Sequence, residues 1–355
     1  MSQQSHTISN ILLQWYSTHQ RELPWRNTTN PYLIWISEII LQQTRVNQGL
    51  DYYYRFVERF PDVHTLAKAE EDEVLKYWQG LGYYSRARNL HKAAKSIDSE
   101  YKGIFPENFD DVLKLSGVGI YTASAICSFA FNKPYAVVDG NVYRVLSRLF
   151  NIDIPIDIPA GQKIFQKLAD EILDKENPAK HNQAIMEFGA LQCVPVNPDC
   201  ESCTLKSNCL SFANKNQSKL PVKSLKVKVK NRYFNFLHIK YQDFTFINQR
   251  NENDIWQKLW EFPLIEENTL LNPDELFQQE AFERLFEGIQ EVKISSHSHP
   301  IKHILTHQRI MAQLFTIEIN ELNDALKHFK KIRINELDQY AVSRLMQLFL
   351  ENHLT

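Results

Sequence analysis

The chain lacks long hydrophobic runs and has little glycine or cysteine. No stretch of about 18 apolar residues occurs, so we expect no membrane-spanning helix. The N-terminal residues Met1 to His6 do not combine a basic segment with an apolar one, so we expect no secretory signal and a cytoplasmic protein. Apolar residues at 43% and charged residues at 23% exclude collagen-like and largely disordered chains. A net charge of −2 does not by itself indicate a nucleic-acid-binding protein.

A length of 355 residues suggests two domains, and the hydrophobic pattern changes once along the chain. Apolar residues recur at three- and four-residue spacing over residues 1–212, which predicts an all-α domain. The expected helices are 8–19, 32–47, 51–59, 72–79, 84–97, 110–115, 122–131, 141–148, 162–173 and 183–191. Lys206 to Lys240 contains nine basic and no acidic residues, and its polar part predicts a linker over residues 213–227.

The remaining residues, 228–355, predict a separate α+β domain. Alternating apolar residues predict strands around 226–230, 234–236, 244–247 and 314–319. Helical spacing predicts helices over 273–286 and 336–351.

Four of the five cysteines lie close together, in the pattern Cys193-x6-Cys200-x2-Cys203-x5-Cys209. In a cytosolic chain such a cluster is more typical of a metal site than of disulfides. Thiolate ligands suit zinc or an iron–sulfur cluster, and the spacing leaves both open, although a zinc ribbon usually has two C-x2-C pairs and this pattern has one. The fifth cysteine, Cys127, lies in an apolar helix and is expected in the core.

A glycine-containing turn, Gly117-Val118-Gly119, separates two predicted helices. Such a turn can direct backbone amides toward phosphates at the start of a helix, and the plain alternative is an interhelical turn. Twenty residues after Gly119, apolar residues lead to Asp139 at the start of another helix. Asp139 is therefore either a helix N-cap or a functional carboxylate, and the local sequence leaves both open.

Glu38 is the single charged residue between Pro31 and Leu41. An apolar environment raises the pKa of a carboxyl group, which allows it to hold a proton near neutral pH and to act as a general acid. The alternative is a structural ion pair with Arg45 or Arg86.

Two further polar segments are candidates for ligand contact. Gln42-Gln43-Thr44-Arg45 follows the apolar helix directly. In Gln79 to Arg88, glycines permit close backbone approach, Leu81 and Tyr83 can wedge or stack, and the arginines can meet phosphates. The alternative for this second segment is an aromatic connection between two helices.

Together these motifs resemble the helix–hairpin–helix DNA glycosylase superfamily, and specifically MutY-type adenine DNA glycosylases. The resemblance covers residues 8–212 and is weaker after residue 230. The matching stretches are Leu23-Pro24-Trp25-Arg26, Trp35 to Thr44, Gly80 to Tyr84, Leu115 to Thr122, Val138 to Val145, Asn182-Gln183-Ala184, the four-cysteine loop, Leu259 to Pro263 and the segment around His303 to His307.

The resemblance implies a multidomain fold, with an all-α helix–hairpin–helix glycosylase core and a C-terminal α+β Nudix-like domain that recognises 8-oxoguanine. It also implies a [4Fe-4S] cluster in the loop 193–209, bound by Cys193, Cys200, Cys203 and Cys209. The expected partner is double-stranded DNA with an A:8-oxoguanine or A:G mispair. The implied enzyme is a monomer that associates with the bacterial nucleoid through DNA.

The implied activity is hydrolysis of the N-glycosidic bond of a flipped-out adenine, in base excision repair. Glu38 would protonate adenine at N7, and Asp139 would stabilise the oxocarbenium ion. Each other expected role is shared by a group of residues. Tyr121 and Asn141 would support the two carboxylates; Arg26 and Gln183 would line the adenine pocket; Gln42, Gln43, Thr44, Leu81, Tyr83, Thr306 and His307 would lie near the mispair; and Gly117, Val118 and Gly119 would bind the DNA backbone.

Position 121 separates the related activities. Endonuclease III-like glycosylase/lyases carry a lysine there as the amine nucleophile, whereas the phenol of Tyr121 cannot form an imine. The sequence therefore predicts a monofunctional glycosylase. The competing interpretations are an endonuclease III-like glycosylase/lyase and a non-enzymatic DNA-binding protein that uses the cluster as a structural staple.

The chain departs from the family pattern at three places. The hairpin reads Leu-Ser-Gly instead of Leu-Pro-Gly, and Leu305-Thr306-His307 stands where many relatives have Phe-Ser-His. The C-terminal domain lacks the Arg-Glu-x-x-Glu-Glu run of Nudix hydrolases, so we interpret it as a recognition module.

Overall fold

The computed structural model describes residues 3–224, 228–250 and 254–353. The chain divides into two compact units. Unit 1 comprises Met1–Lys68 and Lys92–Lys226, and unit 2 comprises Ala69–His91 and Val227–Thr355. No helix within the described ranges is long and apolar enough to cross a membrane.

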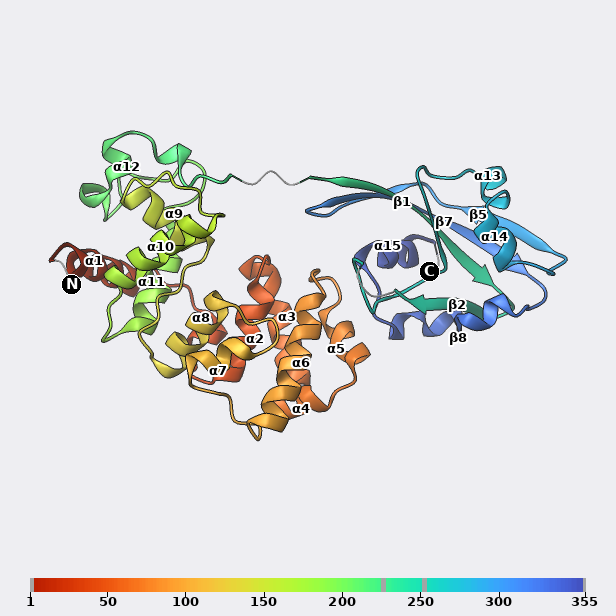
Figure 1. The fold of residues 1–355 in the computed structure, drawn as a ribbon, viewed down its shortest axis with the longest axis horizontal. Coiled ribbons are helices and arrows are strands. Elements are labelled where there is room, and N and C mark those ends of the chain that lie inside the picture. Colours follow the sequence, from red (N-terminus) through yellow and green to blue (C-terminus); the bar gives the residue numbers. More distant parts are fainter. Residues whose placement is uncertain (1–2, 225–227, 251–253, 354–355) are drawn as a thin grey trace. The chain divides into compact units, whose positions relative to one another are not determined.

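Unit 1 is helical, as the apolar spacing predicted (Figure 1). Its helices are α1 (Gln3–His19), α2 (Pro31–Leu41), α3 (Val46–Arg59), α4 (Val63–Lys68), α7 (Phe109–Lys114), α8 (Ile120–Phe131), α9 (Gly140–Leu149), α10 (Pro159–Ile172), α11 (Pro178–Leu191) and α12 (Leu210–Ala213). Helix α6 (Ser85–Glu100) begins in unit 2 and ends in unit 1.

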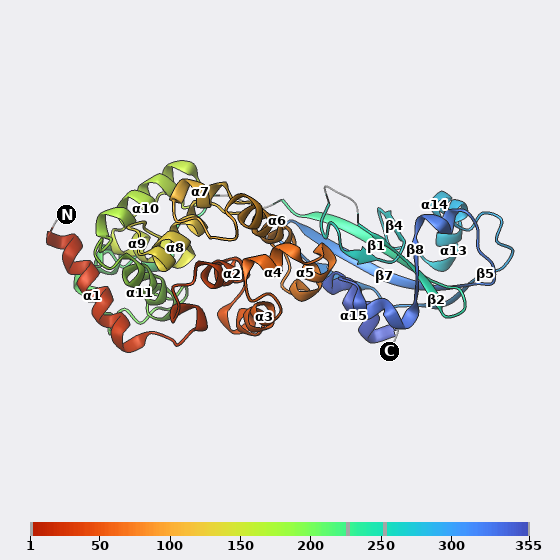
Figure 2. The ribbon, with the colours of Figure 1, turned by 90° about the horizontal axis from the view of Figure 1, so that it is seen from below.

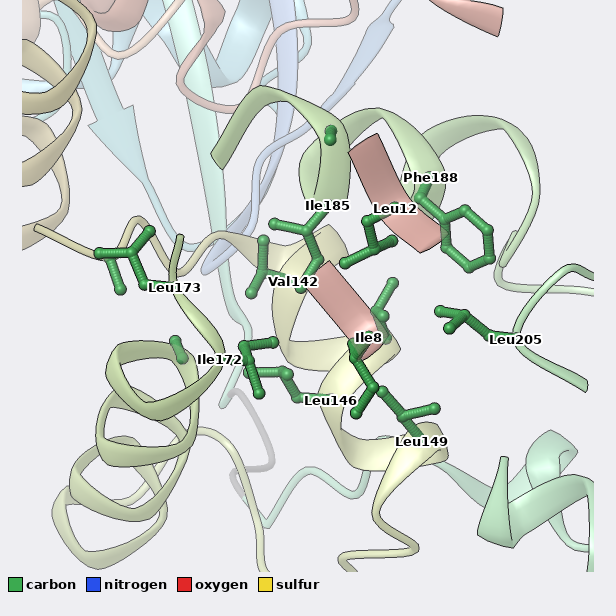
Figure 3. Packing of buried hydrophobic residues seen from close by; sticks show 14 of the residues in the cluster. Ile8, Leu12, Val142, Leu146, Leu149, Ile172, Leu173, Ile185, Phe188 and Leu205 are labelled. Carbon is green, nitrogen blue, oxygen red and sulfur yellow. The ribbon is translucent and has the colours of Figure 1, made fainter. Parts of the chain in front are cut away.

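One hydrophobic core of unit 1 lies between α1, α9, α10 and α11, which pack against one another in both ribbon views (Figures 1 and 2). Figure 3 shows this packing, with Leu12 from α1, Val142 from α9 and Ile185 from α11 directed toward one another. Each of these three side chains is at most 2% exposed. Burial of a large aliphatic side chain contributes about 1.5–3 kcal/mol, so this core holds the start of α9 firmly in place.

The helix expected over residues 32–47 is instead two helices, and that prediction was wrong at its C-terminal end. Helix α2 ends at Leu41, Gln43 has a left-handed φ of 58°, and α3 begins at Val46. A left-handed residue cannot continue a right-handed helix, so the chain turns at Gln42–Arg45.

Unit 2 is an α+β structure with two sheets. Its strands are β1 (Lys230–Lys240), β2 (Phe244–Gln249), β3 (Trp260–Glu261), β4 (Leu264–Glu267), β5 (Val292–His297), β6 (Ile301–Ile304), β7 (Gln308–Ile319) and β8 (Lys330–Arg333). The larger sheet has the order β4-β1-β7-β5, with β6 also paired to β7, and the smaller sheet has the order β3-β2-β8. The central strands β1 and β7 are parallel.

Both faces of the β1–β7 pair are covered, so β1 is buried almost continuously from Arg232 to Ile239, although Asn235 and His238 interrupt its apolar residues. Helix α15 (Arg344–His353) covers the face that carries Phe234 and Phe236. Helices α13 (Pro273–Phe277) and α14 (Glu280–Leu285) cover the face that carries Leu237 and Ile239, as Figure 1 also shows. The segment Ala69–His91, with α5 (Glu71–Trp78), completes the unit.

Three predictions for this half differ from the structure. The strand expected at 226–230 lies partly outside the described residues, and β1 begins only at Lys230. The helix expected over 273–286 is interrupted by extended backbone at Gln279, with a capping box at Asn272 starting its first half. The helix expected over 336–351 is a 3-10 helix, Ile334–Gln339, followed separately by α15.

Candidate active site

The carboxyl group of Glu38 is buried in unit 1. Helix α2 begins because Asn30 caps it and Pro31 follows, and Glu38 lies two turns further on, only 7% exposed. Its Oε2 atom accepts a hydrogen bond of 2.7 Å from the hydroxyl of Tyr121. The partner of Glu38 is therefore a phenol, and not Arg45 or Arg86 as the alternative interpretation expected.

Burial raises the pKa of Glu38 to about 7. The hydrogen bond from Tyr121 opposes this shift, and the nearby charge of Asp139 adds to it. Burial also raises the pKa of Tyr121 well above its ordinary value, so this hydroxyl remains a donor. Glu38 can thus exchange a proton near neutral pH, as its apolar surroundings in the sequence predicted.

Asp139 is the N-cap of α9, and this alternative from the sequence is observed. Its Oδ1 accepts a hydrogen bond from the amide of Val142 at 2.7 Å, and its Oδ2 accepts one from Nδ2 of Asn141 at 2.8 Å. Burial raises the pKa of Asp139, while these hydrogen bonds and Arg144 oppose the shift. The donors around Asp139 stabilise its charged form, whereas burial favours its neutral form.

Arg144 connects Asn141 with the start of the cysteine loop. Its guanidinium donates to Oδ1 of Asn141 at 2.8 Å and to the carbonyl of Gly189 at 2.6 Å, and its Nε donates to the carbonyl of Cys193 at 2.7 Å. Helix α11 also approaches closely here, because a Cβ on Gly189 would lie 2.7 Å from the Cβ of Asn141. Asn141 is therefore fixed from two sides.

An ion cluster around Glu187 was not found from the sequence. Glu187 is 1% exposed and pairs with Arg26 at 2.8 Å and with Arg21 at 2.6 Å. Burial alone would raise its pKa, but hydrogen bonds from the two arginines lower it to about 2. The sequence could have indicated this buried carboxylate, because Glu187 is the one charged residue in the apolar stretch 185–188, as Glu38 is in its helix. In its neighbourhood, Tyr16 donates to Oε1 of Gln183 at 2.9 Å.

One cavity of about 200 Å³ brings together the four predicted catalytic residues and three of the residues predicted to contact the mispair or the adenine. Its lining includes Arg26, Glu38, Thr44, Tyr121, Asp139, Asn141 and Gln183, together with Arg21, Trp25, Met186 and Glu187, among others. Gln42 and Gln43 are not part of this lining. Gln42 instead donates to the hydroxyl of Thr122 at 3.3 Å, and Gln43 is exposed at the turn after α2.

The glycine turn lies where α7 passes into α8. Gly117 has a left-handed φ of 75°, Val118 is buried, and Gly119 is the N-cap of α8. Among the residues that the structure describes, and apart from Gly119, its chain neighbours and the backbone of α8, no atom lies within 4 Å of the position that a Cβ on Gly119 would take. The start of α8 therefore has open space beside its backbone amides.

The remaining predicted contacts lie in unit 2. Tyr83 is 53% exposed with a left-handed φ of 47°, and its hydroxyl lies 2.8 Å from Oγ1 of Thr306. Leu81 is buried at 7% exposure, so it does not project freely. His307 is exposed beside Thr306, in the turn between β6 and β7.

The four clustered cysteines are free thiols that line one cavity, together with Arg148. Cys127 is buried in the core, as expected. Over residues 3–224, 228–250 and 254–353, no three His, Cys, Asp or Glu side chains are arranged to hold a metal ion. The four thiols around this cavity match, in residue type, the four cysteine ligands of a [4Fe-4S] cluster. Arg148 donates to Sγ of Cys193 at 3.4 Å.

Comparisons with known proteins agree with this geometry. Residues 36–171 match the family described as "HhH-GPD superfamily base excision DNA repair protein", and residues 235–352 match the NUDIX domain. The predicted fold class, a helix–hairpin–helix core followed by a Nudix-like domain, is therefore confirmed.

Individual relatives point the same way. An adenine DNA glycosylase of Buchnera aphidicola subsp. Baizongia pistaciae is 40% identical over 269 residues, which cover 74% of this chain and 75% of the relative. A solved thermostable thymine-DNA glycosylase is 29% identical with a TM-score of 0.55, covering 59% of this chain and 97% of that structure. Endonuclease III bound to DNA, at 24% identity and a TM-score of 0.52, covers 60% of this chain and 97% of its own and shares the fold. The chain belongs to the adenine DNA glycosylase family of enzymes.

Proposed function

We propose that this enzyme excises adenine mispaired with 8-oxoguanine or guanine, by hydrolysis of the N-glycosidic bond after base flipping. The observation that carries the proposal is the shared cavity of Glu38, Tyr121 and Asp139, in which the pKa of Glu38 is raised to about 7. An adenine can reach such a cavity only after it leaves the DNA stack.

The first step is protonation of the leaving base. Glu38 donates its proton to N7 of adenine, which makes the base a better leaving group, and the bond between C1′ and N9 then breaks with its electron pair on the base. Arg26 and Gln183 border the cavity, which supports their assignment to binding of the base.

Departure of the base leaves positive charge on the sugar. Asp139, kept anionic by Val142 and Asn141, stabilises this oxocarbenium ion as an ion partner or a transient covalent acceptor. Glu38, now ionised, accepts a proton from the incoming water, whose oxygen bonds to C1′. Two carboxyl groups with different proton affinities thus serve one glycosidic cleavage.

The reaction stops at an abasic site. The phenol of Tyr121, held on Glu38, offers no amine for a Schiff base, so strand cleavage by imine chemistry is not expected. Borohydride trapping at ordinary enzyme concentrations therefore distinguishes this proposal from a glycosylase/lyase.

The other parts of the chain are assigned to DNA and lesion binding. The amides around Gly117–Gly119 bind the DNA backbone, while Tyr83, Thr306 and His307, with Gln43 and Thr44, contact the mispair. Residues 1–212 carry excision and part of the contact with the mispair, residues 228–355 complete lesion reading, and 213–227 link the two domains. A [4Fe-4S] cluster would be held by the four cysteines of residues 193–209 and would tie that loop together.

Single-turnover assays on A:8-oxoguanine, A:G and thymine-glycol duplexes test the proposal. We expect base release from the first two and none from the third. Release from thymine glycol would support the endonuclease III-like alternative, and duplex binding without any release would support the non-enzymatic one.

A further inference from the structure

Residues 254–259, which lead into β3, have an unusual backbone. Trp256 has a φ of 59° and Lys258 has a φ of 68°, a left-handed conformation that bulky L-residues rarely adopt. Such residues persist only where the surrounding structure holds them in place. Backbone bonds from Lys258 to Arg250 at 3.1 Å and from Leu259 to Trp256 at 2.9 Å close the loop.

Arg88 holds the residue between these two positions. One guanidinium nitrogen donates to the backbone carbonyl of Gln257 at 2.8 Å, and the other donates to its side-chain Oε1 at 2.8 Å. Arg88 lies on the part of α6 that belongs to unit 2. A planar guanidinium fixes two acceptors at once, which a lysine cannot do.

The indole of Trp256 supports the neighbouring strand. Its ring lies edge-on to the imidazole of His303, with the centroids 5.6 Å apart, and 6.3 Å from the ring of Phe234. His303 is part of β6, where it pairs with Ile310 of β7. The loop that Arg88 holds is therefore packed against the hairpin that carries Thr306.

The turn of this hairpin is also held by the segment that contains Arg88. The amide of Leu305 donates to the carbonyl of Gln308 at 2.8 Å, which closes the turn, and Tyr83 contacts Thr306. From one short stretch of chain, Tyr83 thus contacts the turn between β6 and β7 of the larger sheet, and Arg88 contacts the segment that leads into β3 of the smaller sheet.

We propose that Arg88 is a positioning residue for lesion reading. Arg88 holds Gln257 and thereby its neighbour Trp256, which packs against His303 of β6. This packing fixes the turn after β6 and so the position of the Thr306 hydroxyl relative to Tyr83. This inference rests on the proposed reading of 8-oxoguanine at that turn. Guanine and 8-oxoguanine differ in polar groups on one edge of the base, so their discrimination depends on well-placed hydrogen-bonding groups.

The test compares Arg88→Ala and Arg88→Lys with wild type in the full-length chain, on duplexes with a single A:8-oxoguanine or A:G pair. We expect Arg88→Ala to lower the ratio of kcat/KM between the two duplexes by at least about tenfold, the effect of one lost hydrogen bond from a charged group. The loss should appear in KM for A:8-oxoguanine, with kcat and the A:G reaction unchanged. Arg88→Lys should lie between Arg88→Ala and wild type.

Arg284→Ala is the matched control, because Arg284 is 71% exposed on α14. If Arg88→Ala unfolds, Gln257→Ala removes one of the two acceptors and should lower the ratio by a smaller factor. An unchanged ratio, or an equal loss on both duplexes, would overturn the role of Arg88. Equal wild-type rates on both duplexes would instead overturn the proposed lesion reading itself.

Discussion

The hydroxyl of Tyr121 donates a 2.7 Å hydrogen bond to Oε2 of Glu38 inside a cavity that Asp139 also lines. This contact stabilises the charged form of Glu38, while burial favours the neutral form, and burial is the larger effect. The proton affinity of Glu38 is thus set by two opposing influences that can be varied separately.

The pH dependence of base release should show both carboxyl groups. Because Glu38 must be protonated and its pKa is raised to about 7, single-turnover rates should fall as the pH rises through about 7. Asp139 must be ionised for the reaction, so rates should also fall as the pH is lowered. Because burial raises the pKa of Asp139, this fall should begin at a higher pH than an ordinary aspartate would give. A rate that stays constant from pH 6 to 9 would contradict this assignment.

Tyr121→Phe removes the hydrogen bond that lowers the pKa of Glu38. The alkaline limb of the pH profile should therefore move to higher pH, although the overall rate falls because Glu38 is less well oriented. The measurement is the full pH profile of the variant beside that of wild type. A limb that moves to lower pH would show that Tyr121 acts on Glu38 in another way.

Glu187→Gln should destabilise the protein by about 3 kcal/mol, because it leaves Arg26 without its buried counter-charge. The lowered pKa of Glu187 has a matching consequence in wild type. The stability that its ionised form contributes is complete above its ordinary pKa of 4.5 and is lost as the pH falls toward about 2. Urea unfolding at pH 7 and at lower pH measures both effects, and Lys167→Gln, at an exposed position, is the control.

Gly189→Ala should lower stability and base release, whereas Gly119→Ala should mainly weaken duplex binding. A methyl group at Gly189 would lie 2.9 Å from the carbonyl oxygen of Asn141, so it should cost about 1–3 kcal/mol of stability and reduce base release. At Gly119 the methyl group meets no other described part of the chain, so stability should change little, while duplex binding should weaken because the proposed DNA backbone contact lies there. Thermal unfolding and duplex titration separate the two. Tight duplex binding by Gly119→Ala would place the DNA backbone elsewhere.

The helical and α+β halves followed from hydrophobic periodicity, which depends on local sequence. The lone charge of Glu38 in an apolar helix correctly indicated a buried carboxyl group. Glu187 carried the same signal, but its partner Arg26 lies 161 positions earlier in the chain, and only the fold brings them together. The turn at Gln43 was missed because glutamine has no marked preference for the left-handed conformation that it adopts there.

The most direct test is single-turnover release of adenine from an A:8-oxoguanine duplex by Glu38→Gln beside wild type. Glutamine keeps the shape of the side chain but cannot donate a carboxylic proton, so we expect duplex binding to persist and base release to fall by at least a factor of about 100. Release at the wild-type rate would remove Glu38 from the reaction and contradict the mechanism.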